Sequence, residues 1–135
     1  TLREAARHMQ ARAEAGDAGG SLVAVASLAG SEAPGYLESY GATKAGVIAM
    51  IKGIAVQMAR YGIRANSILP GWIATDMTEE LRASSGGQGK LLPRIPMRRW
   101  GTPADFGGIA VYLASEASRY HTGDTLVIDG GYAIF

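Results

Sequence analysis

The sequence predicts an α/β fold in which three strands form part of a doubly wound parallel sheet with helices on its faces. The first observation is a set of three short, largely apolar runs at residues 22–26, 65–69 and 126–129, whose length is typical of strands. The run at 22–26 is apolar throughout, as expected for a strand covered on both faces. The second observation is that helical segments separate these runs, and such alternation predicts parallel pairing with right-handed crossovers.

Helices are predicted before, between and after these strands. Residues 2–14 are rich in Ala, Arg and Glu, and residues 40–60 carry apolar side chains at helical spacing. Thr102, followed by Pro103 and Asp105, is typical of a helix N-terminus, so a helix is predicted from residue 103 to about residue 115. Residues 77–97, with a Gly/Ser-rich middle and two prolines, are predicted to be a partly helical, flexible segment.

The composition excludes several classes of function. Hydrophobic residues make up 47% and charged residues 19% of the 135 positions, and the formal net charge is +1. Without a basic excess, we expect no nucleic-acid or anionic-lipid partner. The longest apolar stretch, residues 45–59, is interrupted by Lys52 and Gln57, so no membrane span is expected. The chain has no cysteine, which excludes disulfides and thiolate metal sites, and with no signal-peptide pattern we expect a cytoplasmic protein.

The most informative side chains are Tyr40 and Lys44, with Ser27 thirteen residues before the tyrosine. Residues four apart on a helix share one face, so the phenol and the ammonium are predicted to be neighbours. A tyrosine hydroxyl titrates near ~10 in isolation, and an adjacent ammonium favours the phenolate, which makes the phenol a usable acid or base. A serine hydroxyl at the end of a neighbouring strand can bond the same substrate oxygen. These groups predict a site that protonates a carbonyl as hydride arrives, or that catalyses the reverse reaction.

Taken alone, the Tyr/Lys spacing is a weak signal, because a surface helix with a half-buried tyrosine and a solvated lysine gives the same pattern. Four sequence blocks in a fixed order make it specific. Residues 20–27 read GSLVAVAS, residues 40–47 read YGATKAGV, residues 62–77 read GIRANSILPGWIATDM and residues 122–131 read TGDTLVIDGG. With these blocks the chain resembles, over essentially its whole length, the C-terminal half of a short-chain dehydrogenase/reductase, a family with a Rossmann-like fold.

The resemblance implies a role for each matching residue. Tyr40 would be the general acid in reduction and the base in oxidation, Lys44 would support Tyr40 and bind the nicotinamide ribose, and Ser27 would orient the substrate oxygen. The implied cofactor-binding residues are Tyr40 and Lys44 themselves and, in the loop at the nicotinamide end, Pro70, Gly71, Ile73 and Thr75. The implied reaction interconverts an alcohol and a ketone or aldehyde with NAD or NADP. A sugar, a sugar acid, a 3-oxoacyl thioester and a steroid are all open as substrates, and an epimerase or dehydratase with the same Tyr/Lys pair is a less favoured alternative.

Two parts of the family pattern have no match. The family begins with a strand and a Gly-rich turn that seats the cofactor pyrophosphate, whereas the Gly-rich segments here, residues 16–20 and 84–89, do not follow a strand. The family's catalytic asparagine precedes the serine, and the only asparagine here, Asn66, lies on a later strand. We therefore expect residues 1–135 to be the C-terminal half of a single domain whose N-terminal dinucleotide-binding half is absent, and to be inactive alone. The alternative is a truncated or noncatalytic fragment that acts only as a structural or assembly partner.

The remaining candidates have weaker signals. Trp72 suits plain packing as well as a substrate pocket, and residues 77–97 would form a mobile lid over the substrate. Three arginines could meet an acidic substrate, although a solvated surface is the favoured interpretation: Arg94, Arg98 and Arg99. His8 and His121 have no partner spacing for a metal or a triad, so no metal site is predicted, and Asp129 is interpreted as a turn residue. From the resemblance we expect a homodimer or homotetramer, and we expect an upstream segment or a partner chain to cover the apolar edge of the first strand.

Overall fold

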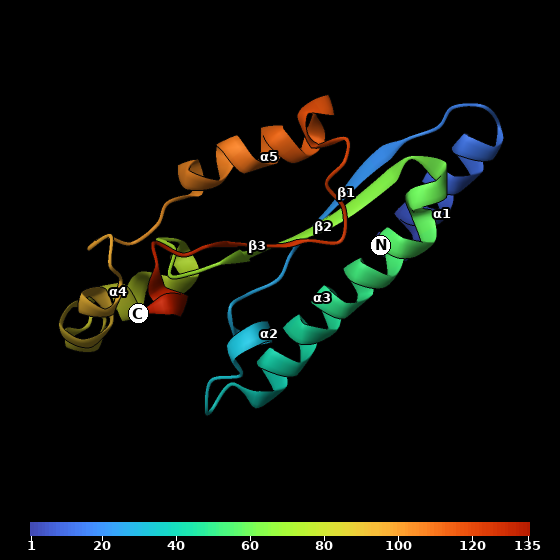
Figure 1. Ribbon diagram of the computed structural model, residues 1–135. Helices are drawn as coiled ribbons and strands as arrows, with labels where there is room; N and C mark the ends of the chain where they lie inside the picture. The colour runs from blue at the N-terminus through green and yellow to red at the C-terminus, as the bar shows by residue number, and fades with distance from the viewer.

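The computed structural model describes residues 1–135, and Figure 1 shows helices packed around a twisted sheet. The strands are β1 (Gly20–Val25), β2 (Ile63–Pro70) and β3 (Thr125–Ile128), which pair in parallel in the order β1-β2-β3. The helices are α1 (Leu2–Glu14), α2 (Ala29–Glu32), α3 (Glu38–Met58), α4 (Glu79–Ala83) and α5 (Gly107–Ala114). Single turns of 3₁₀ or π helix lie at Ala59–Tyr61, Asp76–Thr78, Gly87–Leu91, Leu92–Arg94, Pro103–Phe106, Glu116–Ser118 and Tyr132–Ile134. The predicted α/β class, with three parallel strands and flanking helices, is confirmed.

The register of the sheet brings the carboxyl ends of the three strands to one edge. Val25 of β1 pairs with Ile68 of β2, and Pro70 at the end of β2 pairs with Ile128 at the end of β3. Ser27 and Pro70 therefore each lie two residues beyond the Val25–Ile68 pair. Ligands of open α/β sheets bind outside the carboxyl ends of the strands, so this edge is where a site is expected.

Helices cover the two faces of the sheet (Figure 1): α1 and α3 lie on one side and α5 on the other. The core between the sheet and the first pair of helices is aliphatic and consists of Ala6, Leu22, Ala24, Ile51, Ile54, Ala55, Met58, Ile63 and Ala65. On the other face, the carbonyl oxygen of Leu113 at the end of α5 accepts hydrogen bonds from Ser21 Oγ (2.7 Å) and Arg64 Nη1 (2.9 Å). The positive charge of Arg64 at the C-terminus of α5 also complements the helix dipole. The side chains of β1 and β2 thus hold α5 in place on this face.

The structure differs from the sequence prediction between β1 and α3, where a short helix, α2, replaces the expected loop. Its four residues are too few to show a helical period, which is why the sequence does not indicate it. The helix ends at Glu32, and its C-cap Ala33, just before Pro34, has a left-handed φ of 47°. The predicted capping signal at Thr102 and Asp105 is confirmed, but the segment it starts is first a 3₁₀ turn and becomes α-helical only at Gly107.

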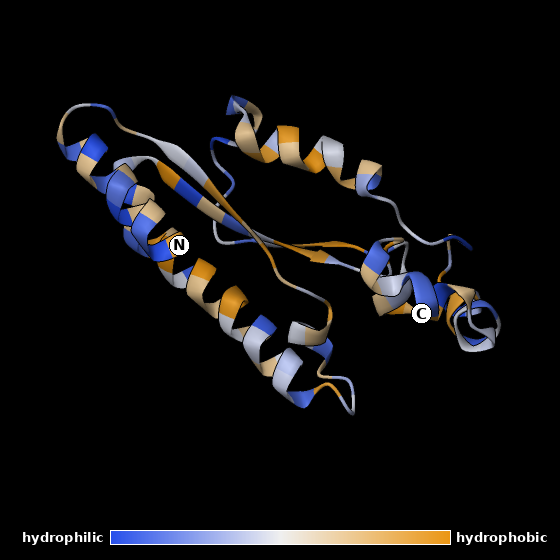
Figure 2. Cartoon of the chain, turned by 180° about the vertical axis from the view of Figure 1, so that it is seen from behind, coloured by the Kyte–Doolittle hydropathy of each residue, from blue (hydrophilic) through white to orange (hydrophobic).

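Several apolar side chains lie uncovered in this chain. Val23 and Val25 alternate with the buried residues of β1, so they lie on its other face, and Val25 is 60% exposed. Val56 on α3 and Val111 on α5 are 84% and 70% exposed. Figure 2 shows the apolar colour on the strands and along α5. These surfaces are of the kind that other protein elements cover.

The helix α3 is more apolar than the sequence argument allows for. Together with the turn that continues it, from Glu38 to Tyr61, it is long and apolar enough to cross a membrane by length and composition, in spite of Lys52 and Gln57. Core helices of globular proteins meet the same criterion. Here Ile51, Ile54 and Met58 of α3 are part of the aliphatic core against the sheet.

Candidate active site

Two glycines allow the segment after Ser27 to lie directly against the first turns of α3. This segment forms α2, which Figure 1 shows beside the start of α3. A Cβ atom on Gly30 would lie 2.7 Å from the carbonyl carbon of Lys44, and one on Gly41 would lie 2.9 Å from the carbonyl oxygen of Ala29. Because real Cβ atoms do not approach backbone so closely, a side chain at either position would push the two segments apart. The packing of α2 on α3 thus brings the serine segment to the turn that carries the tyrosine and the lysine.

Tyr40 and Lys44 share one face of α3, as their spacing predicts. Lys44 Nζ lies 5.6 Å from the centroid of the Tyr40 ring and donates a hydrogen bond of 3.2 Å to the carbonyl oxygen of Val25, the last residue of β1. Ser27 Oγ accepts a hydrogen bond of 3.2 Å from the Ala29 amide, and its own proton has no acceptor in the chain. Tyr40 is 44% exposed. The Lys44 ammonium therefore lies at the end of β1, two residues before Ser27, with the half-exposed Tyr40 ring beside it.

The loop after β2 carries the other predicted site residues and approaches the end of β3. Pro70 closes β2, and a Cβ atom on Gly71 would lie 2.5 Å from the Cβ of Asp129. Only glycine permits this contact between the two strand ends. Ile73 then forms an isolated parallel bridge to Gly101. The loop is thus attached both to the sheet and to the segment that precedes α5.

Thr75 ends this loop as a helix N-cap. The Thr75 amide donates to Thr78 Oγ1 (3.0 Å), and Thr78 Oγ1 donates to the carbonyl oxygen of Ile73 (2.6 Å). Thr75 and Thr78 together form a capping box at the start of the turn Asp76–Thr78. These bonds fix the conformation of the loop in which the resemblance places the nicotinamide contacts.

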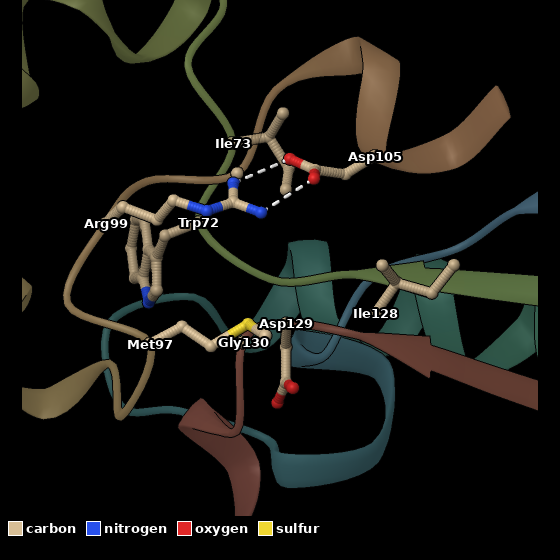
Figure 3. Close-up of a pocket in the computed structure, with 9 residues that line it drawn as sticks. Trp72, Ile73, Met97, Arg99, Asp105, Ile128, Asp129 and Gly130 are labelled. Atoms are coloured by element: carbon tan, nitrogen blue, oxygen red, sulfur yellow. Dashed lines mark hydrogen bonds and ion pairs between the residues drawn. The ribbon is translucent and has the colours of Figure 1, made fainter. Parts of the chain in front are cut away.

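A cavity of about 190 Å³ opens beside this loop, at the end of β3 (Figure 3). Its lining consists of Trp72, Ile73, Met97, Arg99, Gly101, Asp105, Ile128, Asp129 and Gly130. Figure 3 shows the carboxylate of Asp129 turned away from the Arg99–Asp105 pair. That carboxylate accepts hydrogen bonds from the amides of Gly131 (2.8 Å) and Ala133 (2.7 Å), as expected of a residue that shapes a turn.

The charged wall of this cavity is a closed ion pair. Arg99 and Asp105 form two hydrogen bonds, of 2.8 Å and 2.7 Å, in the bidentate geometry that makes such pairs strong. The carboxylate also accepts the amide and hydroxyl of Thr102 (2.7 Å and 3.0 Å). The Arg99 hydrogen bond and these two bonds hold the pKa of Asp105 well below its usual range. The pair ties the loop before α5 to the helix start, and its charges are already compensated.

An aromatic cluster beside the cavity includes a residue that the sequence analysis does not single out, Tyr132. The ring of Trp72 lies edge-on to those of Tyr132 and Trp100, with centroid distances of 6.0 Å in both pairs. Tyr132 also packs on a small core formed by Ala26, Leu28 and Leu69. The sequence around Tyr132 does not predict these contacts, because they are made with residues that lie after β1 and at or after the end of β2, far away in the chain.

His121, for which the sequence shows no partner spacing for a metal or a triad, has two hydrogen-bond partners in the fold. Its Nε2 lies 2.8 Å from Asp124 Oδ2, and its Nδ1 lies 3.1 Å from the hydroxyl of Tyr112. The hydrogen bond with His121 is the largest cause of the lowered pKa of Asp124. The group precedes β3 and connects it to α5, so it lies at the amino end of the strand, opposite the edge that carries Ser27 and Pro70.

Comparison with known proteins identifies the family. The family described as Enoyl-(Acyl carrier protein) reductase matches residues 1–133. The chain belongs to the short-chain dehydrogenases/reductases, a family of oxidoreductases, as the sequence blocks indicate. It spans about half the length of the curated relatives that it matches.

Three similar proteins illustrate the range of the family. The chain is 37% identical over 131 residues to an L-rhamnose 1-dehydrogenase (NAD(P)(+)) of Azotobacter vinelandii, covering 97% of this chain and 50% of the relative. It is 38% identical over 128 residues to a 2-dehydro-3-deoxy-D-gluconate 5-dehydrogenase of Escherichia coli, covering 95% and 49%. A gluconate 5-dehydrogenase from Burkholderia cenocepacia, solved in complex with NADP and tartrate, superposes with a TM-score of 0.86 at 36% identity, over 95% of this chain and 48% of that one.

Proposed function

We propose that this chain is the catalytic part of a nicotinamide-dependent oxidoreductase that interconverts an alcohol and a ketone or aldehyde. The observation that carries the proposal is the packing of Gly30 on Lys44, which sets the serine segment against the turn that bears Tyr40. Three groups suited to proton transfer then lie at the carboxyl edge of a parallel sheet, where ligands of such sheets bind. Membership of an oxidoreductase family supports the same reaction class.

Each of the three residues has a distinct proposed role. The Tyr40 hydroxyl donates a proton to the substrate oxygen in reduction and accepts it in oxidation. The Lys44 ammonium, which is held by the Val25 carbonyl, stabilises the phenolate electrostatically and hydrogen-bonds the cofactor ribose. The proton of Ser27 Oγ, which has no acceptor in the chain, hydrogen-bonds the same substrate oxygen.

The residues present fit the nicotinamide end of NAD or NADP, which supplies or accepts the hydride when it is bound. Besides Tyr40 and Lys44, the residues proposed to hold it are those of the loop after β2: Pro70, Gly71, Ile73 and Thr75. The pyrophosphate requires a Gly-rich turn between a strand and a helix. The two Gly-rich segments lie before β1 and between α4 and the Leu92–Arg94 turn, so neither has this position. We therefore propose that a preceding N-terminal half, as in the relatives, completes the cofactor site.

Relatives of this chain are named for three substrate classes, of which acyl thioesters are one, in an acetoacetyl-CoA reductase and a 3-oxoacyl-[acyl-carrier-protein] reductase, and the other two are polyhydroxylated. One relative is named for the neutral sugar L-rhamnose, and others are named for the sugar acids 2-dehydro-3-deoxy-D-gluconate and gluconate. We propose a small polyhydroxylated substrate of one of these two classes, handled by a homo-oligomer in the cytoplasm. The exposed apolar side chains of α3 and α5 support the assembly.

The experiment that tests the proposal compares the chain alone with a form that also carries the N-terminal half found in the relatives. Intact mass confirms each species, and titration with NADH and NADPH is followed by fluorescence. The extended form is expected to bind at least one cofactor saturably and to oxidise secondary alcohols of sugars or sugar acids. If the extended form binds neither cofactor, the oxidoreductase proposal fails, and a noncatalytic role as an assembly partner takes its place.

A further inference from the structure

Three arginines of one segment, which the sequence treats alike, have different surroundings in the fold. Arg99 forms a bidentate pair with the Asp105 carboxylate, in which each carboxylate oxygen accepts one hydrogen bond. Arg98, in a left-handed conformation with φ of 54°, donates to the carbonyl oxygen of Pro93 at 2.7 Å. Arg94 forms neither an ion pair with any carboxylate nor a side-chain hydrogen bond in the chain. Its charge and all its donors are therefore available.

The guanidinium of Arg94 is nevertheless held in place. Its carbon lies 4.8 Å from the centroid of the Tyr132 ring, in a cation–π contact. Stacking on an aromatic ring orients the guanidinium plane while its N–H groups remain free along the edges. The acid nearest in sequence to this ring, Asp129, accepts hydrogen bonds from the amides of Gly131 and Ala133. An oriented guanidinium without a counter-ion is suited to bind an anion.

Tyr132 links this guanidinium to the segments that carry the proposed reaction site. Tyr132 packs against the small core of Ala26, Leu28 and Leu69, and the first two of these flank Ser27 in the chain. Its ring is also 6.0 Å from that of Trp72, which directly follows Gly71. Tyr132 therefore connects Arg94 with both the serine segment and the proposed nicotinamide loop.

We propose that Arg94 is a specificity-determining residue that binds a carboxylate of the substrate, so that the enzyme acts on a small hydroxy or oxo acid. This inference rests on the proposed function. A planar guanidinium matches the two oxygens of a carboxylate in a bidentate pair. One guanidinium suits a monoanion better than a phosphate dianion, because the charge of Arg99 is neutralised by Asp105 and Arg98 already donates to the Pro93 carbonyl. Arg94 acts here in binding and takes no part in proton transfer.

The test uses two probes that differ only at one end, where D-gluconate carries a carboxylate and the neutral polyol D-glucitol carries a hydroxymethyl group. Their affinities for the binary complex of the extended protein with NADH are measured by calorimetry for wild type, Arg94→Gln, Arg94→Lys and Arg98→Gln. Wild type is expected to bind gluconate more tightly than glucitol. Arg94→Gln should weaken gluconate binding roughly 10- to 100-fold and leave glucitol nearly unchanged, because a bidentate bond to a charged group is lost. Arg94→Lys keeps the charge but loses the planar pair of N–H donors, so its affinity for gluconate should lie between those of wild type and Arg94→Gln.

The outcomes separate this inference from the proposed function. Arg98→Gln removes the same charge from the same segment and is expected to leave both affinities within about twofold. If wild type does not prefer gluconate, or if Arg94→Gln weakens both probes alike, Arg94 is not a carboxylate-binding residue. Saturable binding of NADH or NADPH with either of those results leaves the oxidoreductase proposal standing, whereas a wild type that binds neither cofactor overturns the proposal itself.

Discussion

Gly30 and Lys44 are in backbone contact: a Cβ atom on Gly30 would lie 2.7 Å from the carbonyl carbon of Lys44 and 2.8 Å from the amide nitrogen of Ala45. The atoms in the way belong to the helix backbone, so they cannot rotate aside as a flexible side chain would. The distance between the serine segment and the helix that carries Tyr40 therefore depends on the absence of a side chain at residue 30.

Replacing Gly30 by alanine should separate these two segments. We expect Gly30→Ala to lower the free energy of unfolding by about 1–3 kcal/mol, the usual range for overpacking, and to lower kcat in the extended protein. Gly35→Ala is the matched control, since a Cβ there meets nothing within 4 Å, and it should change stability by less than about 0.5 kcal/mol. Urea unfolding of both variants gives the comparison. Equal stability of the two variants would contradict the contact.

The proposed acid–base role of Tyr40 predicts a selective defect. Tyr40→Phe removes one hydroxyl from an exposed side chain, so it should reduce kcat roughly 10²- to 10⁴-fold while the Kd for NADH changes little. Steady-state kinetics and fluorescence titration measure the two quantities. Retained activity would remove Tyr40 from its role.

Lys44 is proposed to act on two partners, so its loss should affect two parameters. Lys44→Ala is expected to weaken NADH binding and to lower kcat, each by roughly tenfold or more, because the ammonium serves both the phenol and the ribose. Lys52→Ala, about two turns further along the same helix and outside the site, provides the control. A variant that lowers kcat alone would restrict Lys44 to the electrostatic role.

The Arg99–Asp105 pair predicts a pH-dependent contribution to stability. Because the folded-state pKa of Asp105 is lowered, chiefly by the Arg99 hydrogen bond, its contribution is fully present above the unfolded-state value near ~3.9 and is lost as the pH falls below it. Asp105→Asn should lower Tm by roughly a few degrees at pH 7 and at pH 5 alike. The gap between the variant and wild type should narrow below about pH 4. Calorimetry at pH 7, at pH 5 and below about pH 4 measures the difference in Tm between Asp105→Asn and wild type. A difference that widens in acid would contradict the assignment.

The exposed apolar residues predict an assembly. Val56 is 84% exposed on α3, and a charged side chain there would be desolvated if a second copy covers this helix. Val56→Glu should therefore shift sedimentation of the extended protein towards a smaller species. Met77→Glu, at a residue that is 93% exposed on the segment after β2, should leave the distribution unchanged. The same distribution for both variants would show that α3 is not an interface.

Local patterns in the sequence account for most of the fold. The Ala, Arg and Glu content of residues 2–14 and the Thr102–Asp105 signal predict elements that are stabilised within a few residues, and both are confirmed. The neighbouring positions of Tyr40 and Lys44 also follow from the sequence, because one turn of helix determines them. The four-residue helix α2 does not, since its existence depends on packing against α3.

The tertiary structure alone decides which charged and aromatic groups meet. Arg94, Arg98 and Arg99 are equivalent in the sequence, but only the fold pairs Arg99 with Asp105 and stacks Arg94 on Tyr132, 38 residues further along the chain. The same holds for His121, which bonds Tyr112 of α5 and Asp124 before β3. Chain periodicity reports the face of an element that is buried, whereas contacts between strand ends depend on register and crossovers, and these exist only once the sheet has formed.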